Sequence, residues 1–470
     1  MASIDDQTSI AIIGIGCRFA GCSDLKAFWT RVLMGQSAFS SSPDPDASHF
    51  LGRPNAPFGR VTTLQGGYLR DLWQVNPASI DLPTSALQGT NPEIPLATEL
   101  ASQAMRNANL TGKTAVSHDR MGLTLGYSPQ MDCSTVNWCQ QGLVVDQTLD
   151  LIRRCFPHGS TEEFEILREN LLTGLPTYDS RNITSLFHHT IVMSIASRLD
   201  LCGPVYCVNG GGISSQLAIQ SACDELISNR ADMMLSGAIQ GPLNPQSMMP
   251  CSKMGLLSKS DAMHPYGRDA DGLLLGEGGG FLVLKRQPDA LRDGDRIYAT
   301  IRSTGISASG NKKKASEAFP LATKSALRQK DIQFRSLGLI EGDGSSIPSL
   351  DRLEVKSLTG LFEDFATFDV STVALGSAKG LIGDCGAAAG MAGTIKAALA
   401  LHHRIIPPSQ EARTPAEQLR LAETPFYLNL SPRPWVHDDA GLPRRAGIAS
   451  LAIGGGASFL VLEQAAEDRS

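Results

Sequence analysis

Short apolar segments of strand type alternate with helical segments in both halves of the chain. The expected strands are residues 9–16, 121–125, 205–208, 233–238, 279–285, 296–304, 337–341, 373–377, 445–451 and 458–462. The expected helices are residues 25–35, 92–109, 191–199, 214–229, 318–329, 351–362 and 387–402, with further helices on the surface of the core within 138–184. Parallel strands need helical crossovers between them, so this alternation predicts an α/β protein with mostly parallel sheets covered by helices.

The two strand segments 279–285 and 296–304 are expected as a pair between the two halves of the chain, and 445–451 with 458–462 as a closing pair. We find no clear internal sequence repeat and no low-complexity linker that would divide the chain. With 470 residues, 42% of them hydrophobic, the chain can bury a large core. We therefore expect one large domain over residues 1–470.

Composition excludes several classes of function. A formal net charge of −6 gives no reason to expect nucleic acid or an anionic membrane as a partner. The ten cysteines include no Cys-x-x-Cys pair and no zinc-finger spacing, so we expect buried thiols and no metal site. We see no signal peptide and no run of the roughly 20 apolar residues that a membrane span requires. These features favour a cytoplasmic protein.

Several motifs, in order along the chain, resemble those of the beta-ketoacyl synthase (ketosynthase) family of type I polyketide and fatty-acid synthases. They lie at residues 10–19, 195–204, 269–272, 276–278, 283–286, 376–379, 387–393 and 395–397. The resemblance extends from about residue 9 to about residue 464. It implies the thiolase fold, a five-layered αβαβα sandwich of two similar halves, here about 9–290 and about 291–464. It also implies a dimer.

The resemblance further implies a catalytic cysteine and two histidines, and this sequence lacks all three. Residues 208–215 read VNGGGISS where the family has VDTACSSS, so Gly212 replaces the cysteine that would carry the acyl chain. Residues 341–348 read EGDGSSIP for EAHGTGTP, so Asp343 replaces the first histidine. Residues 379–386 read KGLIGDCG for KSNIGHLE, which keeps Lys379 and places Asp384 at the second histidine. A carboxylate would repel the enolate that an imidazole stabilises, so the usual condensation is not expected.

The last family motif, GFGGTNAH, is AIGGGASF at residues 452–459. Its glycine turn survives as Gly454 and Gly455, while Ile453 replaces the phenylalanine. We expect these three residues to line a substrate pocket, together with Ser214 and Cys385, which adjoin the replaced positions. Ser214 is also expected as a helix cap, and a carboxylate beside Cys385 would make its thiol a poor nucleophile.

Three functions remain open for such a protein. One is a partner role like that of a chain-length factor, which shares the fold, lacks the nucleophile and pairs with an active ketosynthase. Another is a repurposed enzyme that uses Asp343 and Asp384 as acid and base to dehydrate, isomerise, cyclise or hydrolyse a carrier-bound chain. The last is a non-catalytic docking module. All three imply an acyl carrier protein, whose phosphopantetheine arm would bring the substrate, and no cofactor of the chain's own. They differ on whether the protein is a heterodimer with an active ketosynthase or a homodimer.

Overall fold

A computed structural model describes most of the chain. It covers residues 9–52, 59–77, 91–110, 118–128, 132–175, 186–309, 315–328, 332–365, 369–409, 412–436 and 442–465. The main-sheet strands run in the order β12-β10-β9-β14-β15-β8-β1-β7-β6-β4-β5. Among the described residues, no helix has the length and hydrophobicity that crossing a bilayer requires.

The first half of the chain forms five strands of this sheet. They are β1 (Ile10–Phe19), β7 (Gly278–Arg286), β6 (Met233–Gln240), β4 (Met121–Tyr127) and β5 (Val205–Val208), in spatial order. Strand β7 is antiparallel to both β1 and β6, whereas β4 is parallel to both β6 and β5. Strand β5 ends the sheet, and its four residues are only half-buried.

The second half repeats this arrangement. Its strands in spatial order are β8 (Ala299–Ala308), β15 (Gly456–Glu463), β14 (Arg445–Ala452), β9 (Leu337–Glu341), β10 (Val373–Gly376) and β12 (Phe426–Leu428). Strand β15 is antiparallel to β8 and β14, and β9 is parallel to β14 and β10. The order and directions of β8-β15-β14-β9-β10 are those of β1-β7-β6-β4-β5. The two halves are therefore structural repeats, although their sequences show none.

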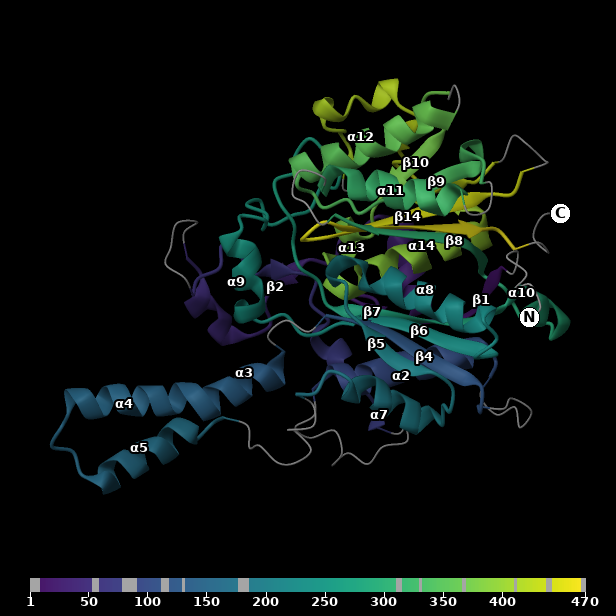
Figure 1. Cartoon of the computed structure of the whole chain (residues 1–470). Helices are drawn as coiled ribbons and strands as arrows, with labels where there is room; N and C mark the ends of the chain where they lie inside the picture. The colour runs from purple at the N-terminus through teal and green to yellow at the C-terminus, as the bar shows by residue number, and fades with distance from the viewer. Residues whose placement is uncertain are drawn as a thin grey trace.

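Helices form three layers around these strands (Figure 1). The central layer holds α8 (Ser214–Ile227) and α14 (Ala389–His403), which contact each other and both halves of the sheet. The outer layers are α2 (Glu93–Asn107) with α7 (Thr190–Leu199) and α11 (Ala315–Arg328) with α12 (Pro348–Phe365). Helix α2 packs on β1 and β7, and α11 packs on β8 and β15. This arrangement confirms the expected five-layered α/β sandwich. The expectation of mostly parallel sheets is wrong, because five of the ten pairings between the described strands of the main sheet are antiparallel.

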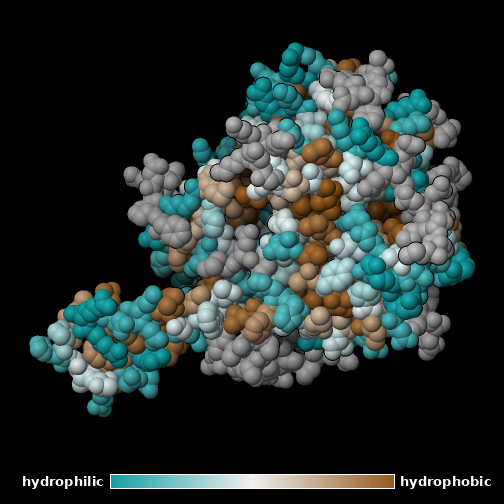
Figure 2. All heavy atoms as spheres, viewed as in Figure 1, coloured by the Kyte–Doolittle hydropathy of each residue, from teal (hydrophilic) through white to brown (hydrophobic). Residues whose placement is uncertain are grey.

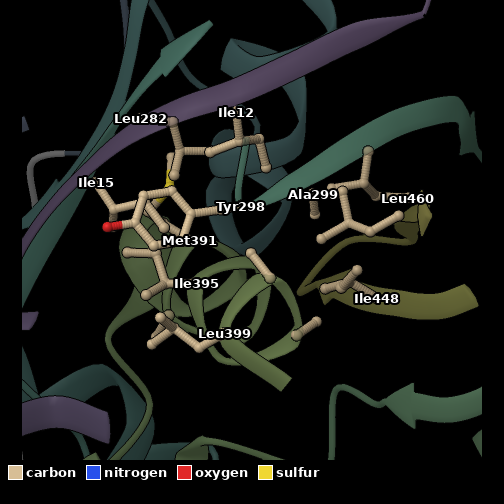
Figure 3. Packing of buried hydrophobic residues seen from close by; sticks show 14 of the residues in the cluster. Ile12, Ile15, Leu282, Tyr298, Ala299, Met391, Ile395, Leu399, Ile448 and Leu460 are labelled. Carbon is tan, nitrogen blue, oxygen red and sulfur yellow. The ribbon is translucent and has the colours of Figure 1, made fainter. Parts of the chain in front are cut away.

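Helix α14 shows why the central layer has its sequence. A helix enclosed between the two halves of a sheet has no face open to water, and every residue of α14 up to Leu401 is buried, including Lys396, which pairs with Glu341. In Figure 3, Met391, Ile395 and Leu399 of α14 lie in one cluster with Ile12 of the first half and Ile448 of the second. The central helix thus joins the two halves into one core.

The strands expected at 279–285 and 296–304 do exist, but they do not pair with each other. Strand β1 lies between β7 and β8, and it pairs with β8 through Ile10, Ala11 and Ile12. The expected pairing is therefore wrong, and the two halves of the sheet are joined at β1 and β8. The closing pair is confirmed as β14 and β15.

The helices expected on the surface of the core within 138–184 form instead an arm that projects from the body (Figure 1). It consists of α3 (Cys133–Cys139), a π-helical segment (Gln140–Val144), α4 (Val145–Cys155) and α5 (Thr161–Leu172). Apolar side chains such as Leu151 and Phe156 are exposed on it. Figure 2 shows hydrophobic patches, in brown, on the surface of the arm. The last part of the expected range, 176–184, lies outside the described residues.

The remaining elements are short. They are α1 (Leu25–Met34), α9 (Pro245–Lys253), α10 (Gln287–Arg292), α13 (Lys379–Ile382) and the small strand pairs β2 (Ser40–Ser41) with β3 (Gln65–Gly66) and β11 (Ile405–Ile406) with β13 (Arg433–Pro434). Helix α1 shows a typical sequence-encoded start and stop. The Asp24 side chain accepts a hydrogen bond from the Ala27 amide, and Gly35 ends the helix in the left-handed conformation.

Candidate functional site

The residues that are expected to replace the two histidines follow neighbouring parallel strands. Asp343 lies two residues beyond the end of β9, and Lys379 and Asp384 lie in the segment that follows β10. The carboxyl ends of parallel strands open on the same edge of a sheet, where binding sites of α/β proteins commonly form. The fold therefore brings these three side chains together from distant positions in the sequence, as their contacts show.

Lys379 bridges the two aspartates. Its Nζ lies 2.9 Å from Oδ1 of Asp343 and 3.1 Å from Oδ2 of Asp384. The side chains of Lys379 and Asp343 are buried, and that of Asp384 is 19% exposed. Burial by itself lowers the pKa of Lys379, but the charges and hydrogen bonds of the two carboxylates outweigh it, so this pKa lies above its usual range. The cluster is thus a buried carboxylate–ammonium–carboxylate triad.

Backbone groups hold the triad in place. The Leu451 amide, at the end of β14, donates to Oδ1 of Asp343 at 3.0 Å. The Gly386 amide donates to Oδ1 of Asp384 at 2.9 Å. The main chain of Asp384 is itself fixed, since its amide donates to the Leu274 carbonyl and its carbonyl accepts from the Gly276 amide. Three separate segments of chain therefore fix the geometry of the triad.

Glu354 of α12 is a site residue that motif comparison alone does not identify as one. Its carboxyl group accepts hydrogen bonds from the amides of Asp343 and Gly344 and from the Tyr266 hydroxyl, at 2.7 to 3.1 Å. Burial raises the pKa of Glu354 to about 8, and the nearby Asp343 charge acts in the same direction. Burial also raises the pKa of Asp351 to about 6. The sequence gives no distinctive signal for it, because α12 carries several other charged residues, such as Asp351 and Lys356.

These raised pKa values predict a pH dependence of stability. The folded protein holds a proton on Glu354 between the ordinary pKa of a glutamate, 4.5, and the folded value of about 8. The unfolded chain releases that proton, so stability falls as pH rises through this window. We expect Glu354 alone to lower the free energy of unfolding by about 2 kcal/mol between pH 6 and pH 8. Urea unfolding at both pH values measures this decrease.

The matched variant for that measurement is Glu354→Gln. Glu93 has a pKa raised to about 7 by burial, so it adds to the wild-type slope. The difference in slope between the wild type and Glu354→Gln isolates the contribution of Glu354. Equal slopes for the two proteins would show that Glu354 does not hold a proton near neutral pH.

Backbone fills the space at Gly212, the residue that is expected to replace the family's cysteine. A Cβ atom added to Gly212 would overlap the carbonyl oxygen of Leu451 and would lie 3.3 Å from its carbonyl carbon. The obstacle is main chain at the end of β14, which cannot move aside as a flexible side chain would. This position is therefore closed to any larger residue in this structure.

Ser214 and Cys385 lie near the replaced positions, but neither lines the apolar cavity beside the triad. The Ser214 hydroxyl donates to the Gly211 carbonyl at 2.7 Å and accepts from the Gly210 amide at 2.9 Å. Both partners precede the helix and α8 has no side-chain cap, so the expected cap at Ser214 is wrong. The Cys385 thiol is fully buried against backbone carbonyl groups, and burial raises its pKa. The arrangement therefore does not support the expectation that these two residues contact a substrate.

The apolar cavity has a volume of about 340 Å³. Its lining residues are Met254, Leu256, Leu273, Ala318, Phe319, Asp343, Ser345, Ile347, Leu350, Leu353, Glu354, Lys379, Asp384 and 451–457. The lining includes the expected Ile453, Gly454 and Gly455. Gly454 and Gly455 have φ values of 107° and 93°, a conformation that favours glycine, and they form the turn between β14 and β15. Among the described residues, no group of three or more His, Cys, Asp or Glu side chains has an arrangement that could hold a metal ion.

Two repeated α/β halves with a site at the carboxyl ends of their strands define a protein of the ketosynthase class. The sequence matches the beta-ketoacyl synthase N-terminal domain over residues 7–290 and the C-terminal domain over residues 298–413. This chain belongs to the beta-ketoacyl synthase family.

Relatives of the chain are polyketide synthases. A component of the phenolphthiocerol/phthiocerol polyketide synthase of Mycobacterium tuberculosis is 28% identical over 466 residues, which cover 97% of this chain and 28% of that protein. The highly reducing polyketide synthase cla2 of Cladosporium cladosporioides is 28% identical over 478 residues, 98% of this chain and 18% of that protein. The chain thus spans less than a third of the length of these relatives.

Solved structures share the fold. The oxazolomycin ketosynthase domain of Streptomyces albus superposes with a TM-score of 0.81 and 25% identity, covering 97% of this chain and 75% of that one. A PfaC ketosynthase–chain length factor superposes with a TM-score of 0.79 and 24% identity, covering 98% of this chain and 48% of that one. Both superpositions extend over nearly the whole of this chain, so its two halves have the relative arrangement of a ketosynthase.

Proposed function

We propose that this protein is a ketosynthase-like subunit of a polyketide-type synthase that cannot condense acyl units by itself and pairs with an active ketosynthase, as a chain-length factor does. The observation that carries the proposal is the closed position at Gly212. An acyl-enzyme needs a nucleophile on a side chain, and here the side chain is absent and the Leu451 main chain occupies its place. The triad of Asp343, Lys379 and Asp384 supplies no imidazole for decarboxylation or for an enolate.

One of the two edges of the sheet, the one at β5, supports a role in pairing. Strand β5 is hydrogen bonded only to β4 among the described strands, and its residues are half-buried. An edge strand offers unpaired amide and carbonyl groups to a second chain. Pairing here would place the partner next to the segment 209–213 that holds Gly212, so each subunit could complete the acyl-binding surface of the other. We infer a heterodimer, with a homodimer as the alternative.

The substrate in this proposal is an acyl chain on the phosphopantetheine arm of an acyl carrier protein. The chain then needs no cofactor of its own. The cavity supports this because its walls are mainly apolar and its rim is exposed. We place the protein in the cytoplasm, where its described free thiols would stay reduced.

One observation favours a second candidate, a repurposed enzyme. Glu354 lines the same cavity, and burial raises its pKa to about 8. A carboxyl group that titrates near neutral pH can act as a general acid or base on a bound chain. Lys379 offsets the charges of Asp343 and Asp384, so we assign the acid–base role in this candidate to Glu354 and regard the two aspartates as its surroundings.

Reconstitution tests the proposed function. We expect the purified chain, given malonyl and acyl carrier thioesters, to release no 3-oxoacyl product by mass spectrometry, because it has neither nucleophile nor imidazoles. Expressed with the ketosynthase from its own gene neighbourhood, it should co-purify as a stable complex, and enlarging the cavity wall by Ala318→Leu should shorten the product. Condensation by the chain alone would refute the proposal. The repurposed enzyme would be favoured by two results together. The protein would form only a homodimer when expressed with that ketosynthase, and it would modify a carrier-bound acyl chain in a reaction that Glu354→Gln abolishes.

A further inference from the structure

The cavity has an exposed apolar rim at one end and a buried polar group, the triad, at the other. Three apolar residues that line it are exposed at its rim: Ile453 is 73% exposed, Met254 55% and Leu350 39%. Leu273 and Phe319 of the walls are buried, as are Asp343 and Lys379 at the polar end. Exposed apolar side chains around an opening are unfavourable in water unless something covers them. The rim and walls therefore fit an apolar chain that enters at Ile453.

The polar end offers more acceptors than donors. Asp343 and Asp384 carry four carboxylate oxygens, while the donors bound to them are the Lys379 ammonium and the amides of Leu451 and Gly386. Lys379 is the only cationic side chain among the described lining residues, and two of its three protons are directed at the aspartates. Two carboxylates and one ammonium leave a net charge of about −1 at this end.

The other polar side chains in the lining do not change this balance. The Ser345 hydroxyl donates to Oδ1 of Asp351 at 2.9 Å, so its one proton is used. Glu354 accepts from two amides and the Tyr266 hydroxyl, and because burial raises its pKa to about 8 it adds no negative charge at pH 7. A ligand group that reaches the triad therefore meets oxygen atoms that can accept further hydrogen bonds.

We propose that the cavity binds an apolar chain whose buried end carries a hydrogen-bond donor, a hydroxyl or an ammonium group, and that it rejects a chain ending in a carboxylate. A hydroxyl donates one hydrogen bond to a carboxylate oxygen of the triad, and an ammonium gains a charge interaction as well. A carboxylate end would bring a third negative charge to a triad whose single ammonium already faces two carboxylates. In the setting of the proposed function, the ligand is a reduced, hydroxyl-bearing acyl chain.

The inference rests on the proposed function in one respect, that the cavity binds an acyl chain. It can be tested on the isolated protein. Octanol, octylammonium and octanoate have the same chain length and differ at the end group. We expect calorimetry at pH 7 to show binding of octanol and octylammonium, and at least about tenfold weaker binding of octanoate. The comparison of octanol with octylammonium distinguishes the two kinds of donor.

Two variants locate the effect at the triad. Asp384→Asn should reduce the preference for octylammonium over octanol by about tenfold, because it removes one of the two negative charges. Asp150→Asn, an exposed change on the projecting arm, should leave all three affinities as in the wild type. Octanoate binding as tightly as octanol, or no binding of any of the three, would overturn the inference. Neither result bears on pairing with a ketosynthase, which the reconstitution measures separately.

Discussion

Introducing a cysteine by Gly212→Cys is expected to destabilise the protein by about 3 kcal/mol and to form no acyl-enzyme. The new Cβ would overlap the Leu451 carbonyl oxygen. To make room, the end of β14 would have to move, and the hydrogen bond from the Leu451 amide to Asp343 would weaken. Urea unfolding measures the loss of stability. Intact-protein mass spectrometry after incubation with an acyl thioester, compared with the wild type, measures acylation at position 212.

The steric part of this prediction has a matched pair of variants. Gly212→Ala adds only the Cβ and should account for most of the destabilisation. Gly360→Ala adds the same atom in α12, where it would meet nothing within 4 Å, and should stabilise the helix by up to about 1 kcal/mol. If Gly212→Ala unfolds at the wild-type urea concentration, the strand end does not close this position. Acylation of Gly212→Cys would mean that the site was disabled by one residue alone.

Removal of the central charge of the triad by Lys379→Met should cost about 3–5 kcal/mol of stability. The methionine fills a similar volume, but Asp343 and Asp384 then face each other in a buried site without the cation that binds both. Breaking a buried ion pair from one side leaves charges that neither water nor a partner stabilises. Urea unfolding of the variant measures the loss.

Charge-matched variants separate this electrostatic effect from a packing effect. The triple variant Lys379→Met, Asp343→Asn and Asp384→Asn has no unpaired charge at the site and should recover more than half of the lost stability. Arg268→Met, which breaks an exposed pair with Glu417, should change stability by less than about 0.5 kcal/mol. A triple variant as unstable as Lys379→Met would show that packing around the lysine stem, and not its charge, is what matters.

The composition of the site is largely predictable from the sequence, whereas its geometry is not. Motif alignment identifies Gly212, Asp343, Lys379 and Asp384, and the fold brings the last three into direct contact. The alignment gives no reason to expect that Lys379 bridges the aspartates. It also misses the Leu451 backbone, which closes the position of Gly212 and holds Asp343. Main-chain contacts of this kind leave no residue type in the sequence to indicate them.

The expectations that the structure does not support concern contacts made in three dimensions. The strands at 279–285 and 296–304 follow each other closely in sequence, but β1 from the start of the chain lies between them. Ser214 and Cys385 adjoin site residues in sequence, yet their side chains contact local backbone. The helical character of α4 and α5 is predictable from the sequence. Their projection from the body (Figure 1) is not, because it depends on whether other segments of the fold offer a surface for them to pack on.

Residue types in a fixed order were enough to indicate the family and the type of most elements, and to predict that the cysteine and both histidines are replaced. The folded arrangement was needed to show that the halves repeat, that backbone closes the position of Gly212, and that an ammonium joins two carboxylates at the end of an apolar cavity. Many different combinations of apolar residues can fill a buried core of the same shape, so the two halves share a structure without sharing a sequence. Burial depends on which segments pack together. Burial lowers the pKa of Lys379, but its two carboxylate partners raise it above the usual range, whereas burial and the Asp343 charge both raise the pKa of Glu354.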